Sequence, residues 1–490
     1  MLVTILTTAE LIYVVVLAMW ILLEKRPPVS TIAWILALIA LPYAGFIVFF
    51  FFGPRRITRK RMKHKLARGK ARARESATEL AKKDAAAIKK PDDPRVAQLE
   101  RLAVGSGEPP SALCEDVTIF HDAASTYAAL EEAIASAKLY VHVAYYIFDS
   151  GQAGSRLAKC LIARAKDGLT VRVLVDDVGS SAMSKKMIAE MRDAGVYFAR
   201  FHPVTLARIR SRIDFRNHRK IVVCDGTVGF TGGINICDDY VAEEAAEDGR
   251  GSKRRVRRGQ PAPWRDTHLR LRGDAVRWLQ LIFLDDWQYV TGYTARKPEY
   301  FPAATNEGNH RVQVVASGPD REGEPIQRIY FAAIALAQTR VLVTTPYFVP
   351  DAPILTALTT AALRGVDVRI LVPRLSDSLI VTAAARSYFD DVLSAGGRVF
   401  EYQPTMVHSK TLVVDDFFGA VGTANMDNRS FRLNFEVTAI AYGSEHAENL
   451  AEQFERDLKL SKEIDKAARK ASPLKWRLAE AGARLLSPLL

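Results

Sequence analysis

The sequence is poor in cysteine: its 490 residues include only Cys114, Cys160, Cys224 and Cys237. No two of them form a CxxC pair, and none stands with histidines at the spacing of a zinc site. Secreted domains that depend on disulfide bonds have many more cysteines for their length. The cysteines therefore indicate neither a zinc-binding module nor a disulfide scaffold, and we interpret them as isolated small side chains.

Acidic residues are absent from two short, strongly basic segments. Residues 53–74 contain eleven Lys/Arg, and residues 250–258 contain six. These seventeen exceed the whole net charge of +13, because the other 51 basic and 55 acidic residues give −4. A nucleic-acid-binding domain carries its basic residues as a patch on the folded surface. The distribution therefore argues against a nucleic-acid partner and favours an anionic membrane surface.

Charged residues are also nearly absent from two long apolar runs. Residues 2–23 contain Glu10 alone, and residues 31–52 contain none. A helix of this length spans about 33 Å, roughly the thickness of a bilayer core. Only residues 24–30 separate the runs, so we predict an antiparallel transmembrane hairpin over 1–53. A signal peptide fits poorly, because no basic residue precedes the first run.

The Lys/Arg distribution also predicts the orientation of this hairpin. The connecting loop contains two basic residues, whereas eleven follow the second run. By the positive-inside rule, the N-terminus and all residues after 53 are expected on the cytoplasmic side of the membrane. Residues 54–111 then form a basic juxtamembrane segment and a proline-containing linker close to anionic headgroups. We expect the folded body to begin near Ala112.

The body contains an internal repeat with an offset of about 200 residues. LYVHVAYYIF at 139–148 corresponds to RVLVTTPYFV at 340–349, and GLTVRVLV at 168–175 corresponds to GVDVRILV at 365–372. In both halves apolar β-branched runs alternate with helical stretches, as in βαβ units around a buried sheet. We therefore predict two similar α/β domains, 112–300 and 301–472, packed as a pseudo-dimer.

Each half contains the same constellation, HxKxxxxD followed by six residues and GxxN. It supplies the candidate catalytic and phosphate-binding residues, which are His218, Lys220, Asp225 and Asn235 in the first half and His408, Lys410, Asp415 and Asn425 in the second. Histidine and lysine two residues apart on a strand share one face. Two such faces brought together present two imidazoles, two ammonium groups and two amides to one phosphate-sized space.

These groups suit phosphodiester transfer. One neutral histidine can attack phosphorus, while the other, protonated, gives its proton to the leaving alkoxide. The lysines and the amides of Asn235 and Asn425 stabilise charge on the non-bridging oxygens, so we expect chemistry without a metal ion or another cofactor. Asp225 and Asp415 each precede a turn, where we expect turn capping more than catalysis.

A buried carboxylate commonly orients a catalytic histidine. Asp266 in RDTHLRLRG and Glu436 in FEVTAIAYG align, because both segments are predicted strands that end in glycine. We predict that Asp266 and Glu436 contact Nδ1 of the catalytic histidines, although the alignment leaves open which carboxylate serves which histidine. Asp239 is the competing candidate in the first half.

The doubled motif resembles the phospholipase D superfamily, and longer segments resemble bacterial cardiolipin synthases. The segments are KRPPVSTIAWILALIALPYAGFIVFFFFG, NHRKIVVCDG, GGINI, PWRDTH, TTPYFVPD, HSKTLVVDD, GTANMDNRSFRLNFE and ARLLSPLL. The resemblance implies a phosphatidyltransferase of the bacterial inner membrane that uses phosphatidylglycerol and other anionic phospholipids. In this family a phosphatidyl group passes from one phosphatidylglycerol to another through a phosphohistidine, releasing glycerol. By analogy, His218 is the expected nucleophile.

Three matters stay open in the sequence. The motifs do not separate transfer to an alcohol from phospholipase D-type hydrolysis, because acceptor choice depends on how the closed site excludes water. They also do not say whether the acceptor is phosphatidylglycerol or phosphatidylethanolamine. The basic insertion 250–258 departs from the family pattern, and the oligomeric state is not specified.

The C-terminal residues 473–490 have the pattern of an amphipathic helix. Apolar side chains recur at helical spacing, at Leu474, Leu478, Ala481, Leu485 and Leu489. Lys475, Arg477 and Arg484 flank them, so we predict that the helix lies in a membrane interface. The alternative is that the stripe docks on the second domain.

Overall fold

The computed structural model describes residues 12–19, 21–22, 31–32, 35–36, 90–202, 215–241, 263–295, 297–321 and 323–490. Most of both predicted membrane spans, and all of the basic segments 53–74 and 250–258, lie outside the described residues. In the described ranges no helix is both long enough and apolar enough to span a bilayer. Leu17 and Ile21 of the first predicted span pack with Tyr13 and with Ile35 of the second.

The strands of the two halves follow the predicted repeat. The first half has β1 (Ala112–Phe120), β2 (Tyr140–Tyr145), β3 (Thr170–Asp176), β4 (Tyr197–Phe201), β5 (Ile221–Cys224), β6 (Val228–Gly232) and β7 (His268–Gly273). The second half has β8 (His310–Ser317), β9 (Arg340–Thr344), β11 (Asp367–Pro373), β12 (Arg398–Tyr402), β13 (Thr411–Val414), β14 (Phe418–Gly422), β16 (Glu436–Tyr442) and β17 (Ser461–Glu463). A separate parallel pair joins β10 (Phe348–Val349) to β15 (Met426–Asp427).

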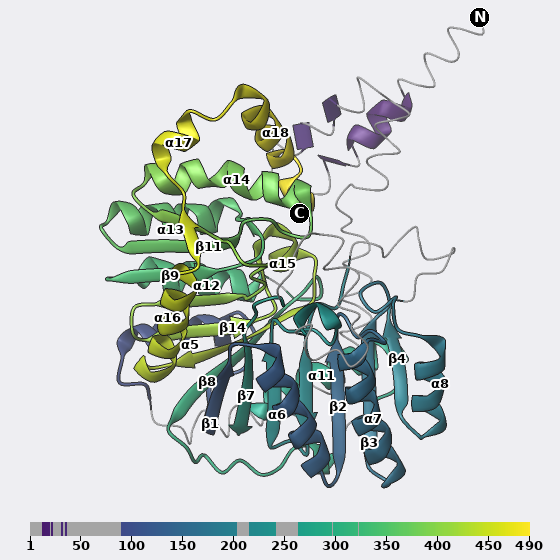
Figure 1. Ribbon diagram of the computed structural model, residues 1–490. Helices are drawn as coiled ribbons and strands as arrows, with labels where there is room; N and C mark the ends of the chain where they lie inside the picture. The colour runs from purple at the N-terminus through teal and green to yellow at the C-terminus, as the bar shows by residue number, and fades with distance from the viewer. Residues whose placement is uncertain are drawn as a thin grey trace, which may run out of the picture.

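One sheet runs through both halves (Figure 1). Over the described residues its strand order is β17-β12-β11-β9-β13-β14-β16-β8-β1-β7-β6-β5-β2-β3-β4. The antiparallel pair β1/β8 is its centre, and the strands outward from there have counterparts in the other half, such as β7 with β16 and β2 with β9; the edge strand β17 is the exception. The prediction of two similar α/β domains is confirmed, because the matched segments 139–148 and 340–349 contain β2 and β9.

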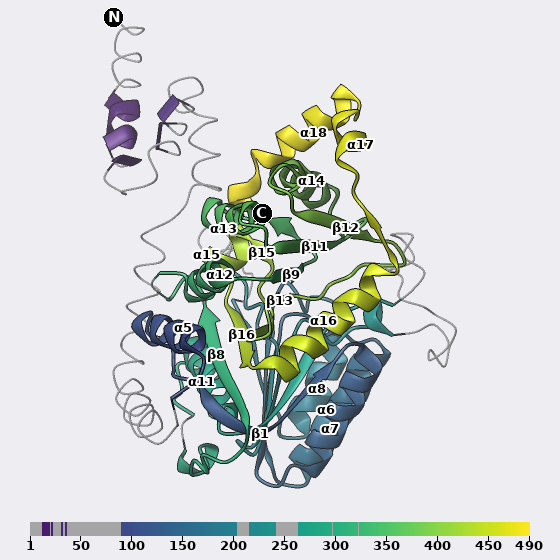
Figure 2. The same cartoon turned by 90° about the vertical axis from the view of Figure 1, so that its left-hand side faces the viewer.

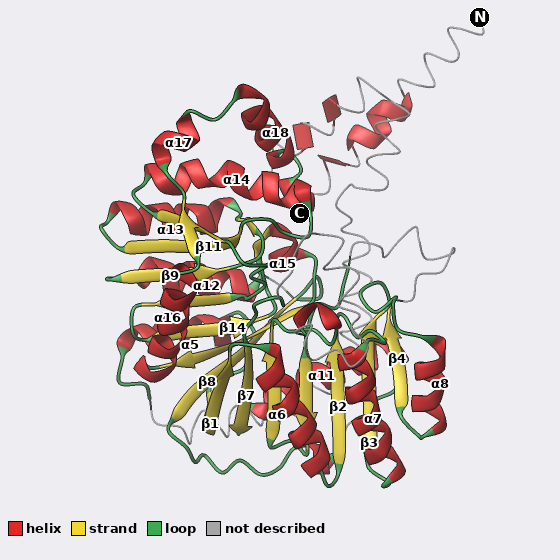
Figure 3. Cartoon of the chain, viewed as in Figure 1, coloured by secondary structure: helices red, strands yellow, loops and turns green. Residues whose placement is uncertain are grey.

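Helices cover both faces of the sheet (Figure 3). In the first half α6 (Ala123–Ser136), α7 (Gln152–Lys166) and α8 (Lys185–Asp193) lie on one face, and α11 (Val276–Thr291) lies on the other. In the second half α12 (Pro325–Leu336), α13 (Ala352–Leu363) and α14 (Leu379–Ser394) lie opposite α16 (Ser444–Leu458), as Figure 2 shows. Shorter helices are η1 (Asp238–Tyr240), η3 (Pro298–Tyr300), α15 (Asn428–Arg432), α17 (Lys466–Lys470) and η4 (Ser487–Leu489).

The alternation of buried side chains explains this layering. Val141 and Val143 of β2 pack beneath α6, α7 and α8, whereas Tyr140 and Ala144 pack on the α11 side. Side-chain caps start several of the helices, with a carboxylate or hydroxyl accepting a backbone N–H of the first turn. The capping residues are Asp93, Asp122, Ser184, Asp351 and Ser378.

One helix corrects the predicted start of the body. Helix α5 (Pro94–Gly105) buries Val96, Leu99 and Ala103 in the core beside α12. The prediction that residues 54–111 are a linker, with the body starting near Ala112, is therefore wrong for the end of that segment. Pro94 misled the interpretation: proline indicates a loop in many contexts, but it is favoured at the first position of a helix, where it stands here.

The C-terminal helix α18 (Leu474–Arg484) packs on α14 but turns its predicted apolar stripe outward. Arg484 lies over the ring of Tyr388, with the guanidinium carbon 4.3 Å from the ring centre. Leu474, Leu478 and Leu485 are 69%, 63% and 82% exposed, and the side chain of Leu489 is outside the description. The helix is therefore docked, but through a face other than the stripe.

The two motif aspartates hold the turns that begin β2 and β9. Asp225 accepts hydrogen bonds at 2.7–2.9 Å from the backbone N–H groups of Lys138, Leu139 and Tyr140. Asp415 accepts equivalent bonds at 2.8–3.0 Å from the N–H groups of Gln338, Thr339 and Arg340. Both aspartates have left-handed backbones, with φ of 53° and 49°, which aspartate tolerates better than most residues. These are the contacts of a turn cap.

Replacement of Asp415 by alanine is expected to destabilise the fold while leaving turnover of the folded protein intact. Three backbone N–H groups would lose their acceptor, and a hydrogen bond to a charged group contributes about 1.5–3 kcal/mol. We expect the unfolding midpoint in detergent to fall by roughly 3–8 °C. The control is Asp416→Ala, whose side chain is 66% exposed. An unchanged midpoint together with lost turnover would assign Asp415 to the chemistry instead.

Candidate active site

The segments that lead into β5 and β13 each present one histidine and one lysine. His218, Lys220, His408 and Lys410 are all buried. The Nζ of Lys220 donates to the carbonyl oxygen of His218 at 2.9 Å, and Lys410 makes the same contact with His408. Each lysine is therefore fixed beside the histidine of its own motif.

A backbone bridge between the halves places Glu436 beside His218. The N–H of His218 donates to the carbonyl of Phe435 at 2.9 Å, and the N–H of Phe435 donates to the carbonyl of Arg216 at 2.9 Å. As a result, Nδ1 of His218 lies 3.0 Å from Glu436 Oε2 and 3.0 Å from the carbonyl oxygen of Thr423. The hydroxyl of Thr423 in turn donates to Glu436 Oε2 at 2.5 Å.

A matching bridge places Asp266 beside His408. The N–H of His408 donates to the carbonyl of Arg265 at 2.6 Å, and the N–H of Arg265 donates to the carbonyl of Met406 at 3.0 Å. Nδ1 of His408 lies 2.7 Å from Asp266 Oδ2. The hydroxyl of Tyr240 lies 2.8 Å from the same Nδ1 and donates to Asp266 Oδ2 at 3.2 Å.

The predicted contacts of Asp266 and Glu436 with Nδ1 are therefore present, and they are crossed between the halves. Asp266 of the first half meets His408, and Glu436 of the second half meets His218. Asp239, the competing candidate, accepts the backbone N–H of Trp264 through its carbonyl at 3.0 Å. The first-half carboxylate that contacts a motif histidine is that of Asp266, and this histidine is His408.

Burial lowers the pKa of every basic group in this cluster. The pKa of His218 is lowered by burial, against the opposing effect of Glu436, and burial together with Lys410 lowers the pKa of His408 to about 4. Burial and the neighbouring Lys410 lower the pKa of Lys220 to about 7, and burial lowers that of Lys410 to about 8. Both imidazoles are therefore neutral at pH 7, and the ammonium groups lose their protons readily.

The two carboxylates have the opposite balance. Burial alone would raise the pKa of Asp266, but Lys410 and His408 hold it below its usual value. Burial would likewise raise the pKa of Glu436, and His218 and the hydroxyl of Thr423 outweigh it. Two ionised carboxylates thus lie behind the imidazoles, and they stabilise positive charge that develops on either ring.

The two motif asparagines have different surroundings. Asn235 Oδ1 accepts the backbone N–H of Ile147 at 3.2 Å, and its Nδ2 lies 3.5 Å from the hydroxyl of Tyr240. Asn425 is also buried, and its Oδ1 has no hydrogen-bond partner within the described part of the chain. The Asn235 amide is therefore already fixed near the His408 side of the site.

One position shows how the halves differ. Gly233 occupies the place that Thr423 has in the second half, and a Cβ there would lie 2.0 Å from Asp266 Oδ1. No hydroxyl can therefore reach the first-half carboxylate from this position. The hydroxyl of Tyr240 makes that contact instead, as the Thr423 hydroxyl does for Glu436.

Sequence reasoning missed Tyr240, Thr423, Arg219 and Tyr146. Arg219, between the motif histidine and lysine, donates through Nε to the carbonyl of Glu436 at 3.0 Å. The ring of Tyr146 meets that of His218 edge-on, with centroids 4.9 Å apart. The repeat held a signal for Tyr146, because Tyr347 occupies the matching position in 340–349.

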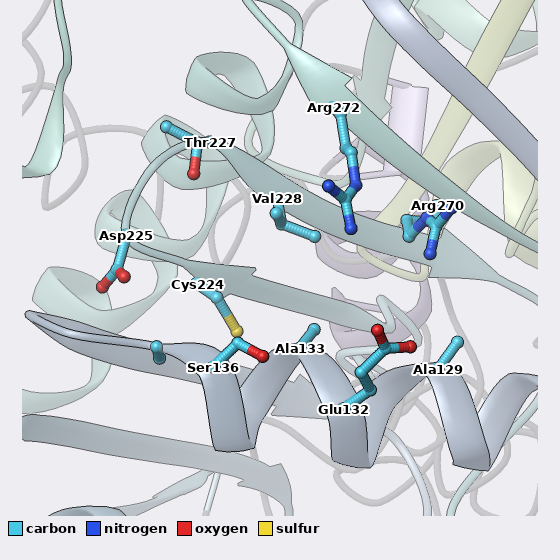
Figure 4. Close-up of a pocket in the computed structure, with 11 residues that line it drawn as sticks. Ala129, Glu132, Ala133, Ser136, Cys224, Asp225, Thr227, Val228, Arg270 and Arg272 are labelled. Atoms are coloured by element: carbon cyan, nitrogen blue, oxygen red, sulfur yellow. The ribbon is translucent and has the colours of Figure 1, made fainter.

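The aspartates of the two motifs do not face the histidines. Strand β5 separates His218 from Asp225, so the two side chains lie at its opposite ends. Asp225 instead borders a pocket of about 160 Å³ between α6 and strands β5 to β7, and neither His218 nor His408 lines this pocket (Figure 4). The sequence grouped these aspartates with the catalytic candidates, and the geometry supports only the turn-capping expectation.

Comparison with known proteins agrees with this geometry. The family model "Cardiolipin synthase, PLD-like domain" matches residues 130–247 and 330–458, and the model "Phospholipase D-nuclease N-terminal" matches residues 11–54. A crystal structure of phosphatidylserine synthase from Haemophilus influenzae shares the fold, with a TM-score of 0.56 and 14% identity. The match covers 80% of this chain and 100% of that one.

Curated relatives match almost the whole chain. A cardiolipin synthase of Geobacillus sp. is 42% identical over 482 residues, covering 97% of this chain and 92% of the relative. That of Geobacillus thermodenitrificans is 41% identical over 491 residues, with the same coverage. Cardiolipin synthase 2 of Bacillus anthracis is 40% identical over 474 residues, covering 96% and 88%. On these matches and on its doubled HxKxxxxD motif, the chain belongs to the cardiolipin synthase family of phospholipase D-like proteins.

Proposed function

We propose that this protein transfers a phosphatidyl group from one phosphatidylglycerol to another, producing cardiolipin and glycerol. The observation that carries the proposal is the pair of crossed histidine–carboxylate contacts, His218 with Glu436 and His408 with Asp266. These contacts orient two imidazoles in one site, each with its own hydrogen-bond partners at Nδ1. Relatives named cardiolipin synthase, matched over nearly the full chain, support the choice of substrate.

In the first step His218 acts as the nucleophile. Its Nδ1 faces two acceptors, Glu436 Oε2 and the Thr423 carbonyl, so Nδ1 carries the proton and the Nε2 lone pair is free to attack phosphorus. A P–N bond forms, and the P–O bond to the glycerol headgroup breaks. The bound phosphodiester anion raises the pKa of His408, so His408 takes up a proton from solvent when the substrate binds. It then gives this proton to the departing glycerol alkoxide.

In the second step His408 acts as the general base and His218 is the leaving group. A hydroxyl of the second phosphatidylglycerol attacks phosphorus while neutral His408 accepts its proton. The new P–O bond forms, the P–N bond breaks, and His218 returns to its neutral state. Glu436 stabilises the positive ring of the phosphohistidine meanwhile, because its carboxylate lies 3.0 Å from Nδ1.

Lys220, Lys410, Asn235 and Asn425 supply the positive field and amide donors for the non-bridging oxygens. The phosphorus chemistry therefore needs no metal ion. Hydrolysis would use the same site with water as the acceptor, and transfer to phosphatidylethanolamine would use its amino alcohol.

The alkaline side of the pH–rate profile should reflect the two lysines. Their pKa values are lowered to about 7 and about 8, so in the free enzyme their positive charge is lost as the pH rises through this range. We expect kcat/KM to fall at least about tenfold between pH 8 and pH 9.5, since this parameter reports free-enzyme groups. Constant kcat/KM up to pH 9.5 would contradict the assigned role of the ammonium groups.

Lipid analysis tests the reaction itself. In phosphatidylglycerol liposomes the protein should form cardiolipin and an equal amount of glycerol, and adding phosphatidylethanolamine identifies any second acceptor. His218→Ala and His408→Ala should each lower turnover about 10³-fold or more, whereas His121→Ala should not. Phosphatidic acid as the main product would establish a hydrolase, and near-normal turnover in either catalytic variant would exclude the two-histidine mechanism.

We also propose that the protein is a multi-pass protein of the bacterial inner membrane with its catalytic body on the cytoplasmic side. The contact of Leu17 and Ile21 with Ile35 supports the hairpin. Described apolar side chains of the two predicted spans that remain more than 45% exposed suit a lipid environment; they are Ile12, Val15, Val16, Met19, Leu22, Ile32 and Leu36. The exposed stripe of α18, with Trp476 60% exposed beside it, suits a second attachment to the interface.

Removal of the α18 stripe should weaken access to lipid without damaging the chemistry. We expect the double variant Leu474→Ser, Leu478→Ser to raise the apparent KM for phosphatidylglycerol in mixed micelles several-fold at nearly unchanged kcat. Leu363→Ser on α13, where leucine is 74% exposed, is the control. Equal KM values for the two proteins would show that the stripe does not contact the membrane.

A further inference from the structure

A cluster of metal-binding side chains lies far from the catalytic histidines. Nδ1 of His310, at the start of β8, is 3.0 Å from Nε2 of His446 and 3.6 Å from Oε2 of Glu445. His446 and Glu445 belong to the first turn of α16. Within the described ranges, no other three His, Cys, Asp or Glu residues bring their ligand atoms within 4.8 Å of one another.

We propose that His310, Glu445 and His446 bind one divalent transition-metal ion, with zinc as the preferred ion. Two imidazoles and one carboxylate are a known zinc ligand set, and zinc–ligand bonds of about 2.0–2.1 Å place tetrahedral ligands about 3.3 Å apart. The observed separations of 3.0 and 3.6 Å lie on either side of that value. A simple hydrogen bond between the imidazoles explains the first distance but not the convergence of the carboxylate.

The surroundings leave room for a fourth ligand. The His446 residue is 4% exposed, while the side chains of His310 and Glu445 are 20% and 75% exposed. The ion would thus have a buried inner side and a solvent-facing position for water. The Glu445 carboxylate also offsets the partial positive charge of the α16 N-terminus, which would otherwise disfavour a cation.

The position of the cluster suggests that the ion serves structure rather than chemistry. Residues 301–309 connect the two domains, and His310 is the first residue after them. His310 pairs with Cys114 of the first domain across the β1/β8 seam. The other end of β8, at Ser317, pairs with Glu436 of the active site, about 23 Å away at about 3.3 Å per residue. A bound ion would therefore fasten the interdomain connection to α16 and leave the catalytic groups untouched.

Metal titration of the full-length protein tests the proposal. The protein is prepared in detergent without a polyhistidine tag, stripped with chelator, and titrated with Co²⁺ as a spectroscopic probe. We expect one equivalent to bind with tetrahedral d–d absorption, zinc to displace it, and zinc to raise the unfolding midpoint. His310→Ala and His446→Ala should each weaken binding about a hundredfold or more, because even an outer-shell change costs 10–100-fold.

Two controls keep the test decisive. Glu445→Gln changes an exposed side chain and should weaken binding without affecting folding, and His121→Ala, whose ring contacts Asn449 of the same helix, should bind like the unaltered protein. Turnover should be the same before and after chelation and in all these variants. Absence of binding by the unaltered protein, or equally tight binding by the alanine variants, would overturn the proposal.

Discussion

The proposed active site depends on two hydrogen bonds that cross between the halves of the chain, His218 to Glu436 and His408 to Asp266. Each hydrogen bond depends on one backbone bridge between the halves. The bridge between Asn217 and Phe435 positions His218 beside Glu436, and the bridge between Arg265 and Val407 positions Asp266 beside His408. Since each half supplies the carboxylate for the other's histidine, neither half holds a complete site. The single sheet, joined at β1/β8, is what keeps the two bridges in register.

Burying so many ionisable groups is unfavourable unless they are paired, because removal from water disfavours every charged form. Neighbouring residues make further contacts, within the first half and across the halves. Arg219 donates to Asp286 at 2.6 Å and to the carbonyl of Ser317 at 3.1 Å, and Arg265 pairs with Asp457 of α16 at 2.8 Å. Burial lowers the pKa values of Lys220 and Lys410, which means that the protein interior disfavours their charged forms. A phosphodiester anion stabilises both ammonium groups, so the site favours an anionic substrate.

Much of this arrangement could be predicted from the sequence, because the repeat and the doubled motif are local patterns. The apolar runs at 139–148 and 340–349 gave the strands, and the alignment of RDTHLRLRG with FEVTAIAYG gave Asp266 and Glu436. The crossing could not be predicted, since it joins residues 218 positions apart through one backbone bridge. Tyr240 could not be predicted, because it lies outside the aligned motif. Its hydroxyl contacts Asp266 as the Thr423 hydroxyl contacts Glu436, whereas the residue aligned with Thr423 is Gly233, which has no hydroxyl. The pair His310 and His446, 136 positions apart, has no spacing that a motif search could detect.

Each carboxylate fixes the histidine of the opposite half. Magnetic resonance of ¹⁵N-histidine in proteoliposomes tests it most directly, with signals assigned by loss in His218→Ala and His408→Ala. The chain has nine histidines, few enough to resolve. Glu436→Gln should shift the Nδ1 signal of His218 and leave that of His408 in place, and Asp266→Asn should do the reverse. If each substitution instead altered the histidine of its own half, the crossed arrangement would be wrong.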